Sequence, residues 1–195
     1  ELDQQERKYV KKYFKEQVLP VLSPQIVDAN HPFPHLLNKE IYVTASLTQK
    51  DKKNKVHMGI VPIPQFISDI LYLPGKDIRY IRMEKVIMEY LDLVFTRYDI
   101  SDANYICVTR NADVAPDDEA LEVTDDFRKL MKSTLHKRRK MAVVRLEVAE
   151  KLSEDMQAFF CVKFQITPDQ IFRTKMPMKL SYIFAISGKL PEPLK

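Results

Sequence analysis

The sequence predicts a single α+β domain, in which one mixed β-sheet of about five to seven strands packs against helices. Segments with apolar residues at helical spacing alternate along the chain with short segments in which every second residue is apolar. An early pair of such strands is joined by a few polar residues, which predicts a β-hairpin and argues against a purely parallel sheet. No apolar run approaches the roughly 18 residues that a membrane helix needs.

The N-terminal segment predicts an amphipathic helix. Val10, Phe14 and Val18 recur at helical spacing, and Pro20 ends the pattern. We therefore place an N-terminal helical arm at residues 1–19 and one domain at residues 20–195. The arm starts inside the helical pattern and without Met, as expected of a piece of a longer protein.

The remaining elements follow from periodicity and from proline. Residues 19–38 are rich in proline, which removes backbone donors and predicts an extended connector. The further expectations are, in order, a hairpin (40–48 and 55–63), short strands around Pro74 and Gly75 (66–83), a helix (84–97), an extended segment (98–113), a helix (126–140), a strand (142–148), a helix (150–164), a short strand (170–175) and a terminal helix (178–189).

Charge and cysteine content narrow the class of protein. The 31 basic and 27 acidic residues give a net charge of +4, which alone indicates no particular partner. Cys107 and Cys161 both stand in apolar segments without metal-type spacing, so we expect buried, reduced thiols and a cytoplasmic location. The glycines Gly59, Gly75 and Gly188 stand alone, which excludes a glycine-rich phosphate loop.

The segment "VDANHPFPH" at residues 27–35 concentrates Asp28, His31 and His35. Two histidines four residues apart bind a metal well on a helix, and Pro32 and Pro34 prevent a helix here. We therefore expect a structural loop in which Asp28 and His31 bond to local backbone, and we assign no metal ligand and no catalytic residue in this chain.

The basic run "KSTLHKRRK" contains Arg138 and Arg139, and Arg110 and Arg145 stand on neighbouring predicted strands. A basic helix end is commonly a solvated terminus favoured by the helix dipole, and Arg145 has Glu147 on the same strand face as an ion-pair partner. The alternative is a phosphate site, because guanidinium groups match phosphate oxygens. The run gives no indication of a nucleic-acid partner, since no aromatic interleaving or nucleic-acid-binding motif accompanies it.

Four blocks of the chain resemble the middle domain of the polyphosphate kinase family, phosphohistidine type. The blocks are "YFKEQVLPVLSPQIVDANHPFPHLLN", "VPIPQFISDILYLPG", "ICVTRNADV" and "RRKMAVVRLEV", and they stand in the family's order. The chain departs from the family pattern at Ser23, Gln65 and Met141. At Gln65 an arginine is usual, which puts any phosphate contact there in doubt.

The resemblance implies that the full enzyme reversibly transfers the terminal phosphate of ATP to inorganic polyphosphate, with Mg²⁺ and a phosphohistidine in its C-terminal domains. None of His31, His35, His57 and His136 matches that histidine. The family uses this domain in dimer contacts, so the resemblance implies other domains and a second copy as partners. It leaves open a peripheral membrane association of the full-length enzyme.

Two hypotheses remain from the sequence. The first is a non-catalytic middle domain that serves dimerisation and assembly of the active site, with Arg110, Arg138, Arg139 and Arg145 as contacts to polyphosphate or nucleotide phosphates. The second is a stand-alone regulatory module that binds an anion or nucleic acid.

Overall fold

The computed structural model describes residues 2–28, 31–75, 77–111 and 142–189, which form an α+β fold. Its α-helices are α1 (Gln4–Tyr13), α2 (Met83–Glu89), α3 (Leu91–Val94), α5 (Glu154–Phe164) and α6 (Tyr182–Ser187). Its strands are β1 (Gln25–Val27), β2 (Ile41–Gln49), β3 (Lys52–Pro62), β4 (Ile70–Tyr72), β5 (Tyr80–Arg82), β6 (Tyr98–Arg110), β7 (Val143–Val148) and β8 (Ile171–Arg173). None of the described helices could cross a membrane.

The predicted mixed sheet is confirmed. Six strands pair in the order β1-β3-β2-β6-β7-β8, and β4 and β5 form a separate two-stranded ribbon. The predicted hairpin is β2 and β3, with Thr44 opposite Ile60. Every pairing in the six-stranded sheet is antiparallel except β7 with β8, which run parallel.

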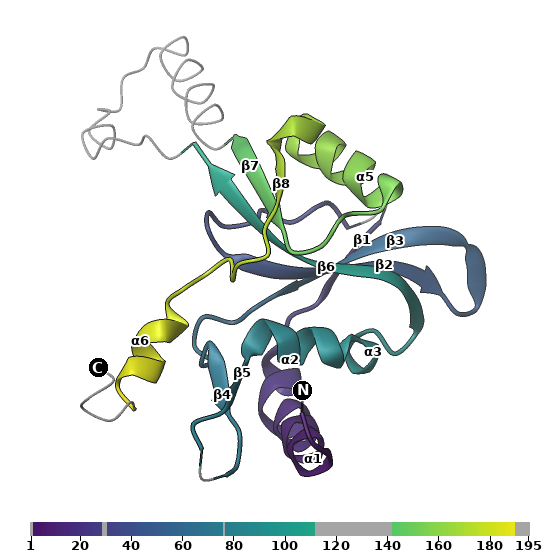
Figure 1. Ribbon diagram of the computed structural model, residues 1–195. Helices are drawn as coiled ribbons and strands as arrows, with labels where there is room; N and C mark the ends of the chain where they lie inside the picture. Colours follow the sequence, from purple (N-terminus) through teal and green to yellow (C-terminus); the bar gives the residue numbers. More distant parts are fainter. Residues whose placement is uncertain (1, 29–30, 76, 112–141, 190–195) are drawn as a thin grey trace, which may run out of the picture.

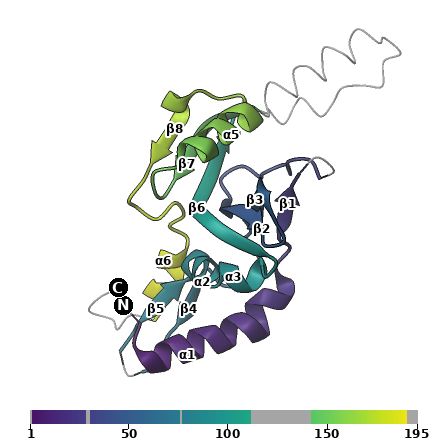
Figure 2. The same cartoon turned by 90° about the vertical axis from the view of Figure 1, so that its right-hand side faces the viewer.

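Helices cover both faces of the sheet (Figure 1). On one face α5 packs over β6 and β7, and this cluster includes the fully buried Leu36 and Phe160. On the other face α1, α2 and α3 cover β2 and β3, and Phe14 and Met83 are fully buried there. Strand β6 runs through both regions (Figure 2) and joins the two clusters into one fold.

Some boundaries differ from those that periodicity predicts. The proline-rich connector contains β1, which pairs with β3 at the edge of the sheet, where prolines on either side of a strand are tolerated. The helix expected at 84–97 is interrupted at Tyr90, whose ring packs 5.1 Å from that of Phe14. The helix expected from residue 150 starts at Glu154, after an N-cap at Ser153.

The N-terminal helix is α1, which continues as a π-helical turn at Phe14–Val18 and a 3₁₀ turn at Leu19–Val21. Its apolar face is buried, and a capping box between Asp3 and Glu6 fixes its start. The division of the chain into 1–19 and 20–195 stays a prediction. The helix expected at 126–140 lies outside the described residues.

The C-terminal segment crosses the molecule after β8 (Figure 1). It descends past the sheet to α6, which lies beside the β4–β5 ribbon. There the Tyr72 hydroxyl donates to the Ala185 carbonyl at 2.9 Å, and the rings of Tyr80 and Tyr182 lie 6.0 Å apart. This crossing makes one wall of the cleft described next.

Candidate functional site

A cleft of about 310 Å³ lies between the start of α2, the carboxyl ends of the parallel strands β7 and β8, and the C-terminal segment. A volume near 300 Å³ is at the small end of the range for small-ligand sites. Its charged lining residues are Arg82, Glu84, Lys85, Glu150, Arg173 and Lys175. Four cations therefore face two carboxylates.

Two ion pairs organise these charges. Arg82 binds Glu84 at 3.0 Å, with side chains that are only 20% and 11% exposed, and Arg173 binds Glu150. Lys85 and Lys175 are exposed, and neither forms an ion pair with another described residue. The cleft therefore carries a net positive charge that the described residues do not neutralise.

Burial sets the protonation of two further groups in the cleft wall. It raises the pKa of the Glu84 carboxyl, although the Arg82 guanidinium opposes this effect. Burial also raises the pKa of the Tyr105 hydroxyl, on β6, far above neutral pH. Tyr105 therefore stays uncharged and adds no negative charge to the cleft.

Asn104 fixes the edge of the cleft from within the sheet. Its side chain is 1% exposed, and its Oδ1 accepts from the backbone N–H groups of Ala149 and Glu150, both at 3.1 Å. Its Nδ2 donates to the Glu150 carbonyl at 2.8 Å. These bonds hold the turn after β7, so Asn104 is a positioning residue for Glu150.

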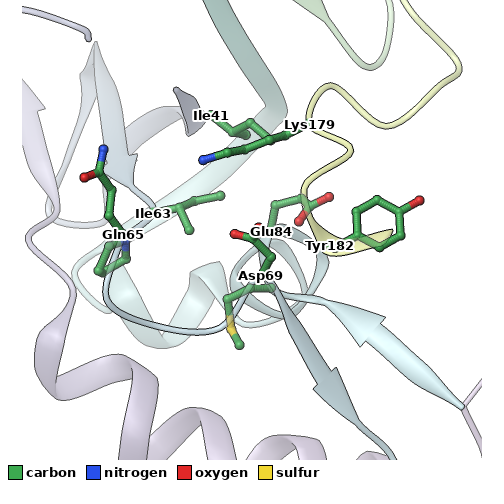
Figure 3. Close-up of a pocket in the computed structure, with 9 residues that line it drawn as sticks. Ile41, Ile63, Gln65, Asp69, Glu84, Lys179 and Tyr182 are labelled. Carbon is green, nitrogen blue, oxygen red and sulfur yellow. The ribbon is translucent and has the colours of Figure 1, made fainter. Parts of the chain in front are cut away.

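A second, much smaller pocket of about 30 Å³ adjoins the cleft (Figure 3). Lys179 extends from the C-terminal segment towards the side of Gln65, whereas the Tyr182 hydroxyl points away from these residues. Lys179 binds Glu40 at 3.2 Å, and Gln65 donates to the other oxygen of that carboxylate at 3.1 Å. The pocket has room for about one water molecule, which is too small for a ligand. Its polar residues instead attach the C-terminal segment to the rest of the domain.

In the loop at residues 27–35, Asp28 and His31 form the local hydrogen bonds that the sequence predicts for them. Asp28 Oδ1 accepts from the backbone N–H of His31 at 2.8 Å and lies 2.9 Å from His31 Nδ1, while the Asp28 N–H donates to the His31 carbonyl at 3.1 Å. Within the described ranges, no three His, Cys, Asp or Glu side chains are grouped closely enough to hold a metal ion.

His35 lies apart from that turn, in another cavity of about 380 Å³ that Arg110 and Lys163 also line. Burial, and secondarily the charge of Arg110, lower the pKa of His35 below its usual value. Arg110 Nε donates to the Leu36 carbonyl at 2.8 Å, and its backbone N–H donates to Asn38 Oδ1 at 2.9 Å. Arg110 thus ties the connector to the end of β6.

Arg145 has the ion pair that the sequence suggests for it. It binds Glu147 at 3.0 Å, and its guanidinium lies 4.4 Å from the centre of the Phe172 ring. Arg138 and Arg139 lie outside the described residues, as does His136. Arg110 and Arg145 line no common cavity among the pockets above.

The two cysteines differ in exposure. Cys107 is buried and Cys161 is half-buried, and neither forms a disulfide. Burial raises the pKa of the Cys107 thiol to about 11, so it stays protonated at neutral pH.

Sequence reasoning missed the cleft because its cations come from two distant segments. Arg82 directly precedes α2 and Lys85 lies in its first turn, whereas Arg173 ends β8 and Lys175 follows it, about 90 residues later. Neither pair is a charge run. The only local signal is that each pair stands directly at the end of a predicted short strand.

Comparison with known proteins gives consistent results. Residues 5–186 match the family described as polyphosphate kinase middle domain. Polyphosphate kinase of Bacillus anthracis is 32% identical over 196 residues, covering 97% of this chain and 28% of that protein. Polyphosphate kinase of Pseudomonas putida is 26% identical, covering 92% of this chain and 25% of that protein. The chain thus spans about a quarter of the length of these relatives.

A solved structure shares the fold. The crystal structure of polyphosphate kinase from Porphyromonas gingivalis matches with a TM-score of 0.69 and 18% identity, over 100% of this chain and 26% of that one. At this identity the likeness shows a common fold.

Proposed function

Because the chain belongs to the polyphosphate kinase middle-domain family, we propose that it works as the middle domain of an enzyme that reversibly transfers the terminal phosphate of ATP to inorganic polyphosphate. The observation that carries this proposal is the match over residues 5–186. In the proposal, the phosphohistidine belongs to the C-terminal part of the longer protein, and this domain serves dimerisation and assembly of the active site.

In this proposal the histidines of the domain take no part in phosphate transfer. His31 is held by Asp28, and His57 lies edge-on to Tyr98, with ring centres 6.1 Å apart. The proposal assigns Mg²⁺ and ATP to the full-length enzyme and no metal ligand to this chain. It places the enzyme in the cytoplasm.

The proposal extends to Arg110, Arg138, Arg139 and Arg145 as residues that steer or hold phosphate groups. If the two arginines of the basic run steer polyphosphate, the double change Arg138→Glu and Arg139→Glu in the full-length enzyme raises the apparent KM for polyphosphate. An unchanged KM in a folded variant removes that role.

The test of the main proposal uses ATP labelled at its terminal phosphate. Full-length protein is expected to form labelled polyphosphate with Mg²⁺ and to carry the label on a histidine outside residues 1–195, whereas this chain alone is expected to show no turnover. Label on His31, His35, His57 or His136 contradicts the proposal. Absence of turnover in the full-length protein, with anion binding retained by this chain, favours a stand-alone regulatory module instead.

A further inference from the structure

We propose that the cleft lined by Arg82, Lys85, Arg173 and Lys175 binds an inorganic phosphate chain of a few units. The choice of a phosphate chain rests on the proposed function. The location of the site rests on the geometry and charge of the cleft itself.

Charge is the first argument for an anion. Lys85 and Lys175 bring positive charge to the cleft from two separate elements, one from α2 and one from the C-terminal segment, and neither has a described carboxylate partner. Arg82 and Arg173 each bind one carboxylate, and a guanidinium has five N–H donors, so one carboxylate does not use its full capacity. An anion in the cleft would therefore lie among cations that come from two distant segments of the chain.

The lining favours a phosphate chain over a nucleotide. The volume of about 310 Å³ suits a small ligand. Tyr105 is the one aromatic residue among the described lining residues, and its ring also packs into the apolar cluster under α1 and α2. The cleft therefore offers cations on several sides but no exposed aromatic face on which a base would stack.

The walls are held in place without a ligand. Asn104 fixes the turn that carries Glu150, as described above. The segment after β8 is fixed beside this turn, because the Thr174 N–H donates to the Val148 carbonyl at 2.9 Å and the Met176 N–H donates to Thr174 Oγ1 at 3.2 Å. A site with fixed walls loses less conformational freedom on binding, which favours affinity.

The cavity around His35 offers a matched comparison within the same chain. It shares no described lining residue with the cleft, and Lys163 brings positive charge to it. Arg110, a phosphate contact in the proposed function, also lines this cavity. The variant Lys163→Glu therefore reports whether tripolyphosphate binds in the cleft or in the cavity beside Arg110.

The experiment measures tripolyphosphate binding to this chain by isothermal titration calorimetry at low and moderate salt. The test variant carries Lys85→Glu and Lys175→Glu. The control carries Lys11→Glu and Lys12→Glu, which make the same change in net charge on exposed positions of α1. All these positions are exposed, so we expect thermal melting to show intact folds.

We expect the cleft variant to bind tripolyphosphate at least about tenfold more weakly, with a shallower dependence on salt, because two charged contacts are lost. We expect the α1 control and Lys163→Glu to stay within about twofold of the parent. Equal losses in the cleft variant and a control, or no binding by the parent, overturn the proposal.

A second ligand tests the chemical class. If ATP binds much more tightly than tripolyphosphate, the nucleoside supplies affinity and the phosphate-chain assignment is wrong. The calorimetry does not depend on turnover, so it separates the two proposals. If the cleft binds phosphate but the full-length protein makes no polyphosphate, only the proposed function is wrong. If the full-length protein makes polyphosphate but the cleft binds none, only this inference is wrong.

Discussion

The proline-rich loop at residues 27–35 and the cleft beside α2 hold their polar side chains in opposite ways. In the loop, Asp28 and His31 are close in sequence and bond to each other and to local backbone. In the cleft, cations from segments about 90 residues apart meet around a cavity, and Lys85 and Lys175 have no described carboxylate partner.

The difference shows what distinguishes a binding site from a dense polar motif. Polar groups whose hydrogen bonds are satisfied by their own loop stabilise a conformation and have little left to offer a ligand. Several elements can also bring like charges to one cavity. If fewer opposite charges line that cavity, the remaining charge can attract a ligand. Changes in the loop should therefore alter the free energy of unfolding, and changes in the cleft should alter affinity.

The largest effect is expected at the end of the loop. Leu36 is fully buried under α5, so Leu36→Ala should lower the free energy of unfolding by about 2–5 kcal/mol. Urea denaturation measures this loss. The folded variant should bind tripolyphosphate as the parent does, and weaker binding would mean that the loop and the cleft are coupled.

Asn104→Ala should affect both stability and affinity. It removes the acceptor for the N–H groups of Ala149 and Glu150, so we expect a loss of about 2–3 kcal/mol in the free energy of unfolding. Because the turn that carries Glu150 is loosened, tripolyphosphate should also bind more weakly. Unchanged affinity in calorimetry would show that this turn does not shape the cleft.

Glu84→Gln should strengthen binding, since it removes a carboxylate from the cleft and leaves Arg82 to contact the ligand. We expect affinity for tripolyphosphate to rise about two- to fivefold. A fall in affinity would indicate that the Arg82–Glu84 pair positions the site.

The raised pKa of Glu84 also predicts that stability depends on pH, and Glu84→Gln tests this. Burial raises the pKa of Glu84 above its usual value of 4.5, so the folded state holds this proton more tightly than the unfolded state. The resulting stability is fully present below the unfolded pKa and is lost as pH rises through the folded pKa. Urea titrations at several pH values should show this decline in the parent and less of it in Glu84→Gln; equal declines would contradict the assignment.

The smallest effect is expected at the exposed His31. His31→Ala removes the contact between its ring and Asp28, which should cost less than about 1 kcal/mol. Melting temperature and tripolyphosphate affinity should stay close to those of the parent. A large loss of tripolyphosphate affinity would indicate that the loop takes part in binding.

Much of the fold follows from local pattern. The β2–β3 hairpin and α1 have strong periodicity, and their existence is confirmed. The break at Tyr90 could not be predicted, because no proline or glycine marks it and the ring packs against Phe14 from another helix. Strand β1 could not be predicted from local pattern, because three residues between prolines are too few to show a hydrophobic period. The strand forms through its pairing with β3.

The candidate site was less accessible from sequence. The ion pair of Arg145 with Glu147 could be predicted, because residues two apart on a strand share a face. Lys85 and Lys175 line the same cleft because of the path that the C-terminal segment takes after β8. That path depends on contacts such as the hydrogen bond from Tyr72 to Ala185. No local pattern encodes such a crossing.

The central claim is that phosphate binds in the cleft and not at the loop. Nuclear magnetic resonance of the isotope-labelled chain, titrated with tripolyphosphate, tests it most directly. We predict saturable shifts of the backbone signals of Lys85, Glu150, Thr174 and Lys175, with those of Asp28 and His31 unchanged. Shifts concentrated at residues 28–35, with the cleft signals unmoved, would contradict the account.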